Sequence, residues 1–510
     1  MTRDYVGTVM KGASLVFIFS IFGSILGYIL RIALFRTLSI ADFGLFYAVF
    51  AFISLVAFVQ DFGFSAILSK FIPEFLVKKQ FWKIKSSIVF LLIEQFVIGL
   101  IAFFPLIIFS DQIATLFFKN MTASPLIFWL ALTNIITFGI FLSIFQGFKK
   151  MGRFSIAQVL QNTIVVIYVW ILISTGMMGV VEVSIGYFIG ALVCMITFFI
   201  FLVTIKSDGF RGFLREGMVW NSKLYKILTI FALSIFIGTV AGAITNYTDT
   251  LTLTYFRSPE EVGYYQVALP TSQIPFALSV SLIAILFPII SELWTRKETL
   301  MLSNGLMLIL KLLLVIAVPL AMIFIAFPDS VILLLFGGKS LPAVLSLQIL
   351  SVGVIFLICA NLFSSTLIAI GRPLLNTKIV LFIAVFNLTF NLLLVPIYGV
   401  MGASLTTAAS FILLFLLSIY FAKKNVSFNI PFFDIVKIFS GGILLFLVIN
   451  YLKAIMYYQI HVETVVIFSI SFILYMAFII FTKTITKNDL RIFKNSLPRF
   501  LYNILNKVLF

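Results

Sequence analysis

The chain has 510 residues, of which 62% are hydrophobic and only 10% are charged. A soluble globular protein is nearer half apolar and about a quarter charged, so the composition excludes an ordinary soluble domain. The net charge of +17 could suggest nucleic acid, but the basic residues are spread over short connectors between apolar segments, which argues against that partner.

Apolar segments recur along the whole chain. A stretch of about 20 apolar residues spans a bilayer, so we expect an all-α polytopic membrane protein with about 14 transmembrane helices. The predicted spans are residues 11–35, 43–69, 84–109, 124–148, 154–175, 180–205, 224–254, 262–291, 302–327, 342–370, 374–395, 400–422, 432–453 and 461–482.

The first predicted span carries two arginines, Arg31 and Arg36, near its outer end. A guanidinium matches phosphate oxygens with two parallel hydrogen bonds, so both residues are candidates for binding a pyrophosphate. The alternative for each is a side chain that extends from the end of a span to the lipid headgroups. The sequence leaves both roles open.

The second and third predicted spans each contain a carboxylate, Asp61 and Glu94. Ionisable groups inside a membrane are costly unless paired or hydrated, so they are functional candidates. A buried carboxylate can exchange H+ or bind Na+, and we expect Asp61 and Glu94 to be candidates for ion coupling. For Asp61 a hydrogen bond that packs two helices explains the residue equally well.

From the seventh span onward the chain repeats its first half. Phe43-Gly44 returns as Val262-Gly263 and Gly152-Arg153 returns as Gly371-Arg372, each 219 residues later. The offset covers six spans, an even number, so the two halves enter the membrane in the same direction. The sequence therefore predicts two parallel six-helix lobes with pseudo-twofold symmetry, which in transporters enclose the substrate path.

The seventh span contains the most polar stretch of any span, with Asp249 among Asn246 and three threonines. At an offset of 215, which the repeated Gly23 and Gly238 also show, Asn246 is the counterpart of Arg31. We therefore expect Asn246 and Asp249 to line the cavity, and Arg31 to meet Asp249 across the central cleft in one state. A purely structural ion pair is the alternative.

The last two spans have no counterpart in the first half, and a basic tail follows them. The tail has apolar residues at helical spacing, which is typical of an amphipathic helix lying on a membrane surface. The predicted domains are a first lobe (1–210), a second lobe (211–425), two appended transmembrane helices (426–482) and a cytoplasmic tail (483–510).

The basic residues indicate the orientation. With fourteen spans, 28 of the 35 lysines and arginines fall on the side of the N-terminus. Positive charge concentrates on the cytoplasmic side of membrane proteins, so we expect both termini in the cytoplasm and the protein in the plasma membrane, in contact with its lipids.

Several short motifs resemble one known family. They are the first connector at residues 36–45, Asp61-Phe62-Gly63, Asp249 followed by Val262-Gly263-Tyr264-Tyr265, and Leu335-Phe336-Gly337. With the repeat they resemble the polysaccharide transporters, the lipid-linked oligosaccharide or O-antigen flippases of the multidrug/oligosaccharidyl-lipid/polysaccharide exporter superfamily. The resemblance implies alternating access that moves a polyprenyl-pyrophosphate glycan from the cytoplasmic to the outer leaflet, for surface polysaccharide assembly beside glycan-assembly enzymes.

Three alternatives remain: a drug or cation antiporter of the same superfamily, a lipid II flippase, and a membrane enzyme of glycan assembly. The arginines and the appended helices count against an antiporter. No external loop carries paired acids in the way that a membrane glycosyltransferase or polymerase would need, so we expect no enzyme. We also expect no cofactor or metal, because His461 is the single histidine and the segment Gly338-Lys339-Ser340 lacks the earlier glycine of a phosphate loop, with Leu333 in its place.

Overall fold

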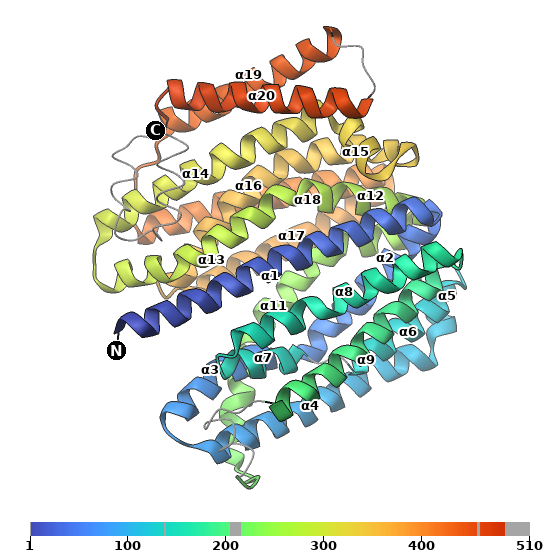
Figure 1. Cartoon of the computed structure of the whole chain (residues 1–510), viewed down its shortest axis with the longest axis vertical. Helices are drawn as coiled ribbons and strands as arrows, with labels where there is room; N and C mark the ends of the chain where they lie inside the picture. Colours follow the sequence, from blue (N-terminus) through green and yellow to red (C-terminus); the bar gives the residue numbers. More distant parts are fainter. Residues whose placement is uncertain (1, 137–138, 205–215, 456–459, 485–510) are drawn as a thin grey trace. The chain divides into compact units, whose positions relative to one another are not determined.

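The computed structural model describes residues 2–136, 139–204, 216–455 and 460–484, and in these ranges the chain is helical without strands (Figure 1). Contacts divide it into two units, residues 1–263 and 264–510. The first unit contains α1 (Thr2–Thr37), α2 (Ile40–Asp61), α3 (Phe64–Val77), α4 (Phe81–Ile108), α5 (Ser110–Leu116), α6 (Ala123–Ile136), α7 (Gly139–Gly147), α8 (Met151–Thr175), α9 (Val180–Thr204), α11 (Ser222–Phe256) and the start of α12 (Pro259–Ser272).

The second unit contains the rest of α12, followed by α13 (Ile274–Thr295), α14 (Thr299–Ala326), α15 (Pro328–Phe336), the 3-10 helix η1 (Gly338–Ala343), α16 (Val344–Ala369), α17 (Pro373–Tyr398), α18 (Val400–Asn425), α19 (Phe432–Ile455) and α20 (Ile460–Phe481). In the described residues, 12 helical segments are long and apolar enough to cross a membrane. The consecutive helices α12 and α13 and the apolar helix α20 correspond to the other two predicted spans, in line with the expected count of about 14.

The helices repeat in pairs along the chain. Helices α4 and α14 both have 28 residues and begin 218 residues apart, and α9 and α18 begin 220 residues apart. Helix α1 has 36 residues and α11 has 35. The predicted duplication is therefore visible in the matching lengths and spacing of these three helix pairs.

Equivalent turns of the two repeats also use the same backbone device. Lys79 and Lys297 both adopt positive φ, 52° and 61°. One residue later, Gln80 donates its backbone N–H to Phe75 O (2.9 Å), and Glu298 donates to Leu293 O (3.0 Å). These are the bonds by which a left-handed residue closes the C-terminus of a helix. They give both repeats short, sharp turns between consecutive spans.

The core of the first unit lies where α3, α4, α7 and the beginning of α11 meet. Its fully buried members include Phe64, Ile84, Phe145 and Leu228. Helix α11 also runs along α2, with Phe62 and Phe236 packing their rings 4.4 Å apart. The seventh span thus packs against helices of the first repeat. The predicted lobe boundary at 210 lies outside the described residues.

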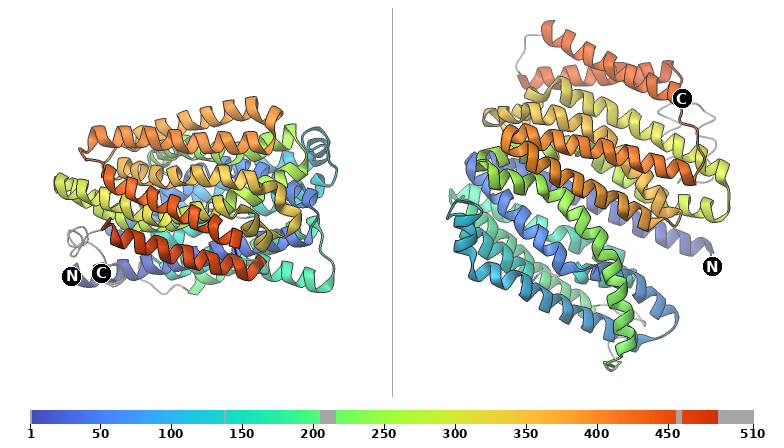
Figure 2. Two further views of the ribbon diagram at one scale, coloured as in Figure 1. Left: turned by 90° about the horizontal axis from the view of Figure 1, so that it is seen from above. Right: turned by 180° about the vertical axis from the view of Figure 1, so that it is seen from behind.

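In the second unit α16 lies at the centre, packed on α13, α14 and α18. The appended helices α19 and α20 lie side by side, in orange-red in both views of Figure 2. Helix α19 packs along α14, and Gly441 and Gly442 bring its backbone close to its neighbours: a methyl on Gly442 would lie 2.6 Å from Val318 Cγ1. The appended pair is therefore seated on the second unit through α14.

Candidate functional site

Arg31 lies on an aromatic platform in the first unit. Its guanidinium carbon is 3.9 Å from the centre of the Tyr47 ring. Tyr47 is itself packed edge-on against Phe43 and Phe46, and Tyr187 of α9 completes the cluster against Phe46. A cation this close to an aromatic ring is attracted by the negative charge of the ring face. The aromatic cluster therefore holds the Arg31 guanidinium against Tyr47.

Arg36 differs from Arg31 in its surroundings. It lies in the last turn of α1 and is exposed. A cation at the C-terminus of a helix interacts favourably with the helix dipole. Capping the end of α1 is therefore a sufficient structural role for Arg36, and its part in a pyrophosphate site stays a prediction.

The polar stretch of α11 is mostly satisfied within its own helix. Thr248 donates its hydroxyl to Ile244 O at 2.6 Å, and Thr252 donates to Thr248 O at 2.8 Å. Such bonds to the preceding turn let a threonine lie in an apolar setting. Asp249 is 2% exposed, whereas Asn246 is exposed. The threonine bonds satisfy hydroxyl groups only. They do not explain the carboxylate of Asp249, which is the buried candidate on this helix.

The repeated glycines pack on one another inside the first unit. A methyl on Gly44, in the first turns of α2, would overlap the carbonyl oxygen of Pro259. A methyl on Gly263 would lie 2.9 Å from the carbonyl oxygen of Ile40. Both positions need glycine because the backbones of α2 and α12 touch there. The sequence repeat that identified Gly44 and Gly263 therefore marks a direct contact between its two copies.

Asp61 lies at a break within a predicted membrane span. Helix α2 ends at Asp61, and α3 begins at Phe64 after Phe62 and Gly63, both with positive φ. Ser65 donates its hydroxyl to Asp61 Oδ1 at 2.5 Å, and a methyl on Gly139 would lie 3.3 Å from the same oxygen. Broken helices at membrane depth occur where backbone groups serve a site or a cavity. Coupling of an ion by Asp61 stays a prediction.

Glu94 lies in the middle of α4 and is half-buried. Within the described part of the chain its Oε2 atom is buried without a hydrogen-bond partner. A carboxylate held this way is costly in an apolar setting, so Glu94 remains a candidate for ion coupling. Its neighbour Gln95 faces the protein interior and is 2% exposed.

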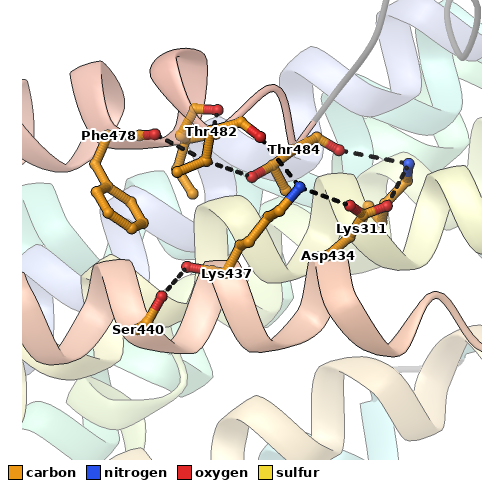
Figure 3. A network of polar contacts seen from close by, with 8 residues as sticks. Lys311, Asp434, Lys437, Ser440, Phe478, Thr482 and Thr484 are labelled. Atoms are coloured by element: carbon orange, nitrogen blue, oxygen red, sulfur yellow. Dashed lines mark hydrogen bonds and ion pairs between the residues drawn. The ribbon is translucent and has the colours of Figure 1, made fainter.

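Sequence reasoning missed a charged network in the second unit (Figure 3). Lys311 of α14 is 5% exposed and reaches Asp434 Oδ2 of α19 at 3.2 Å. Lys437 lies 3.7 Å from the other oxygen of Asp434 and donates to Thr482 O at 3.1 Å. Asp434 was not singled out because nothing in a linear sequence shows that it starts a helix lying against Lys311.

The structure thus places the predicted residues in separate settings. Arg31 contacts Tyr47, Asp249 is buried on α11, and Asp61 and Glu94 lie on different helices. The pairing of Arg31 with Asp249 stays a prediction. The aromatic platform was not predicted either, although Phe43 and Tyr47, four residues apart, lie on one face of α2.

Comparison with known proteins adds an independent finding. A family model described as polysaccharide biosynthesis protein matches residues 9–294, more than half of the chain. An uncharacterized membrane protein of Methanocaldococcus jannaschii is 32% identical, over 82% of this chain and 85% of that protein. A probable low-salt glycan biosynthesis flippase, Agl15, of Haloferax volcanii is 21% identical over 82% of this chain and 84% of its own length.

Two solved structures are similar in fold. The inward closed lipid II flippase MurJ aligns with a TM-score of 0.72 and 17% identity, over 92% of this chain and 98% of that one. An inward-facing multidrug resistance transporter of the MATE family and MOP superfamily aligns with a TM-score of 0.69 and 15% identity, over 79% of this chain and 94% of that one. At these identities the likeness is one of fold.

Proposed function

This chain belongs to the polysaccharide biosynthesis protein family, and we propose that it is a flippase that moves a lipid-linked oligosaccharide across the membrane. The observation that carries the proposal is the family match over residues 9–294, on a chain with the fold of the MOP-superfamily transporters. The cargo would be a polyprenyl-pyrophosphate glycan moved from the cytoplasmic to the outer leaflet of the plasma membrane, with both chain termini in the cytoplasm.

The setting of Arg31 supports an anionic cargo. A guanidinium stacked on Tyr47 keeps its orientation while it exchanges partners in its plane. In the proposed cycle Arg31 binds the pyrophosphate in one state and pairs with Asp249 in the other, so that cargo and carboxylate compete for one cation. Asp61 and Glu94 would couple the cycle to H+ or Na+. Alternating access needs this kind of differential contact between two states.

A lipid II flippase is the second candidate, and the appended helices favour it over an antiporter. The lipid II flippase structure aligns with 92% of this chain, whereas the multidrug transporter aligns with 79%. Both flippase assignments share a pyrophosphate-linked head group and differ in the glycan. A transport assay therefore has to offer both cargoes.

The test uses the purified full chain in liposomes with one of three cargoes: a fluorescent polyprenyl-pyrophosphate oligosaccharide, fluorescent lipid II, or a cationic dye. We expect transport of the oligosaccharide at least tenfold faster than in empty liposomes. Arg31→Glu and Asp249→Arg should each abolish it, and the double variant should partly restore it, because the pair is re-formed with exchanged charges. Arg296→Glu, at an arginine outside the candidate site whose side chain is 62% exposed, serves as the control and should retain most of the rate.

Three results would overturn these assignments. Transport of lipid II alone would replace the proposed cargo with the second candidate, and transport of the dye alone would reject both flippase assignments. Normal rates in both single variants, with normal insertion, would remove Arg31 and Asp249 from the mechanism while leaving the function itself in place.

A further inference from the structure

A pocket of about 710 Å³ opens in the second unit between α14 and the chain that joins α18 to α19. One wall is a single face of α14, whose lining residues recur at intervals of three and four along the helix. The other wall is formed by the end of α18 and its connector. The lining residues are Thr299, Leu300, Ser303, Asn304, Met307, Leu308, Lys311, Lys423, Ser427, Phe428, Asn429 and Pro431.

The lining is basic and becomes more buried along α14. Two lysines and no acid are among its 12 lining residues. At the mouth Asn304, Lys423 and Asn429 are exposed, whereas Lys311 is 5% exposed. Asp434 neutralises one charge of the region by pairing with Lys311 at 3.2 Å, and Lys437 adds another cation beside that carboxylate. Among the described residues, the pocket therefore keeps a positive surplus.

The length of α14 places the mouth of the pocket near the expected level of the lipid headgroups. At the other end of α14, Lys453 donates to Ala326 O at 3.1 Å and pairs with Asp329 at 3.4 Å, which marks a polar boundary. A hydrocarbon core of about 30 Å corresponds to about 20 helical residues. Counting back from Ala326 places the opposite boundary near Leu306, about five residues before Lys311.

Exposed apolar side chains lie at the mouth of the pocket and next to it in the chain. Leu300 on the rim is 75% exposed, and Phe432 and Phe433, which follow the lining residue Pro431, are 68% and 81% exposed. Exposed apolar groups next to a basic pocket suit an amphiphile, whose charged head enters the pocket while its chain remains in lipid. A soluble anion would make no use of them.

We propose that this pocket binds the phosphate group of a lipid, with Lys423 supplying the charge at the mouth and Lys311, which also pairs with Asp434, lying at the floor. Asn304 and Asn429 supply hydrogen-bond donors at the mouth. The same chemistry comes from two sources, the headgroup of an anionic phospholipid or the phosphates of a polyprenyl carrier. A lipid held here would touch α14 and the connector to the appended helices, and so would link lipid binding to the position of α19. The inference does not rest on the direction or cargo of transport.

The test measures binding to the full chain in a nonionic detergent by titration calorimetry. The probes are dihexanoylphosphatidic acid, farnesyl pyrophosphate and inorganic phosphate. We expect at least one amphiphile to bind tenfold more tightly than inorganic phosphate, and the tighter of the two to identify the source. Lys423→Glu on one wall and Asn304→Asp on the other should each weaken that binding at least tenfold, because each places an acid beside the phosphate.

Lys424 provides the matched control. It follows Lys423 on the same helix end and is also exposed, but it lines a different pocket, near Arg372 and Asn425. Lys424→Glu should change the affinity by less than threefold. Equal losses in Lys423→Glu and Lys424→Glu would overturn the proposal, since they would show general attraction to a basic surface. Equal affinity for inorganic phosphate, or no binding of any probe, would also overturn it. Unchanged elution and melting of each variant confirm that the fold is intact.

Discussion

Helices α4 and α14 are counterparts in the two repeats, yet they occupy opposite environments. Each has 28 residues, and their central ionisable residues, Glu94 and Lys311, fall within one residue of the same place. In the apolar stretch of α14, 72% of the residues are buried, against 22% in that of α4. Lys311 meets a carboxylate, whereas Glu94 Oε2 has no hydrogen-bond partner among the described residues.

The appended helices supply the partners of Lys311 and part of the packing around α14. Helix α19 packs along α14 and brings Asp434 to Lys311. Helix α20 packs on α19 and is followed by Thr482 and Thr484, whose carbonyls accept from Lys437 and Lys311. The first repeat has no such addition. The two repeats therefore share helix length and turn geometry. Helix α19, which follows the second repeat, supplies the carboxylate that pairs with Lys311 of α14.

The largest expected effect comes from removing the carboxylate that α19 supplies. Asp434→Leu leaves Lys311 buried beside an apolar side chain, and breaking a buried pair costs about 3–5 kcal/mol. We expect a value of about 3 kcal/mol, at the lower end of that range, because the Asp434 side chain is 25% exposed. The midpoint of thermal unfolding in detergent measures the loss.

Two further variants establish whether the effect belongs to the pair. The double change Lys311→Met with Asp434→Leu should recover most of the stability, because no charge is then left buried. Glu74→Leu removes an acid from the exposed pair with Lys78, whose side chains are 41% and 54% exposed, and should cost less than about 1 kcal/mol. A double variant no more stable than Asp434→Leu would show that Lys311 is held by other contacts.

The repeat could be predicted from the sequence because it shows in short motifs and in the lengths of single segments. The lengths of the apolar segments predicted the spans. Gly44 and Gly263 are both needed where two backbones touch, and they occupy equivalent positions in the two repeats. Contacts such as Arg31 on Tyr47 or Lys311 with Asp434 depend on how separate helices lie against each other. The Lys311 pair joins residues 123 positions apart, and neither residue type reveals its partner. That is why the fold could be anticipated and the polar network could not.

A smaller effect should follow from pushing α19 away from α14. Gly442→Ala places a methyl 2.6 Å from Val318 Cγ1, and Val318 is fully buried with a β-branched side chain that has little room to turn. Overpacking of a well-filled core costs about 1–3 kcal/mol. Gly27→Ala on α1 is the control, because no atom lies within 4 Å of the added methyl. A stable Gly442→Ala variant would mean that α19 shifts freely on α14.

The smallest change in stability is expected from replacing Glu94, and unlike the change at Asp434 it should not be a loss. Among the described residues Glu94 Oε2 is buried without a hydrogen-bond partner, so replacing Glu94 with an apolar residue removes a desolvation cost. Glu94→Leu should therefore leave stability unchanged or raise it by up to about 1 kcal/mol. If Glu94 also couples transport to an ion, the same variant should lose the dependence of transport on pH or Na+ while it remains as stable as the parent. A destabilisation as large as that of Asp434→Leu would show instead that α4 holds its charge as firmly as α14 does, and the contrast between the repeats would fail.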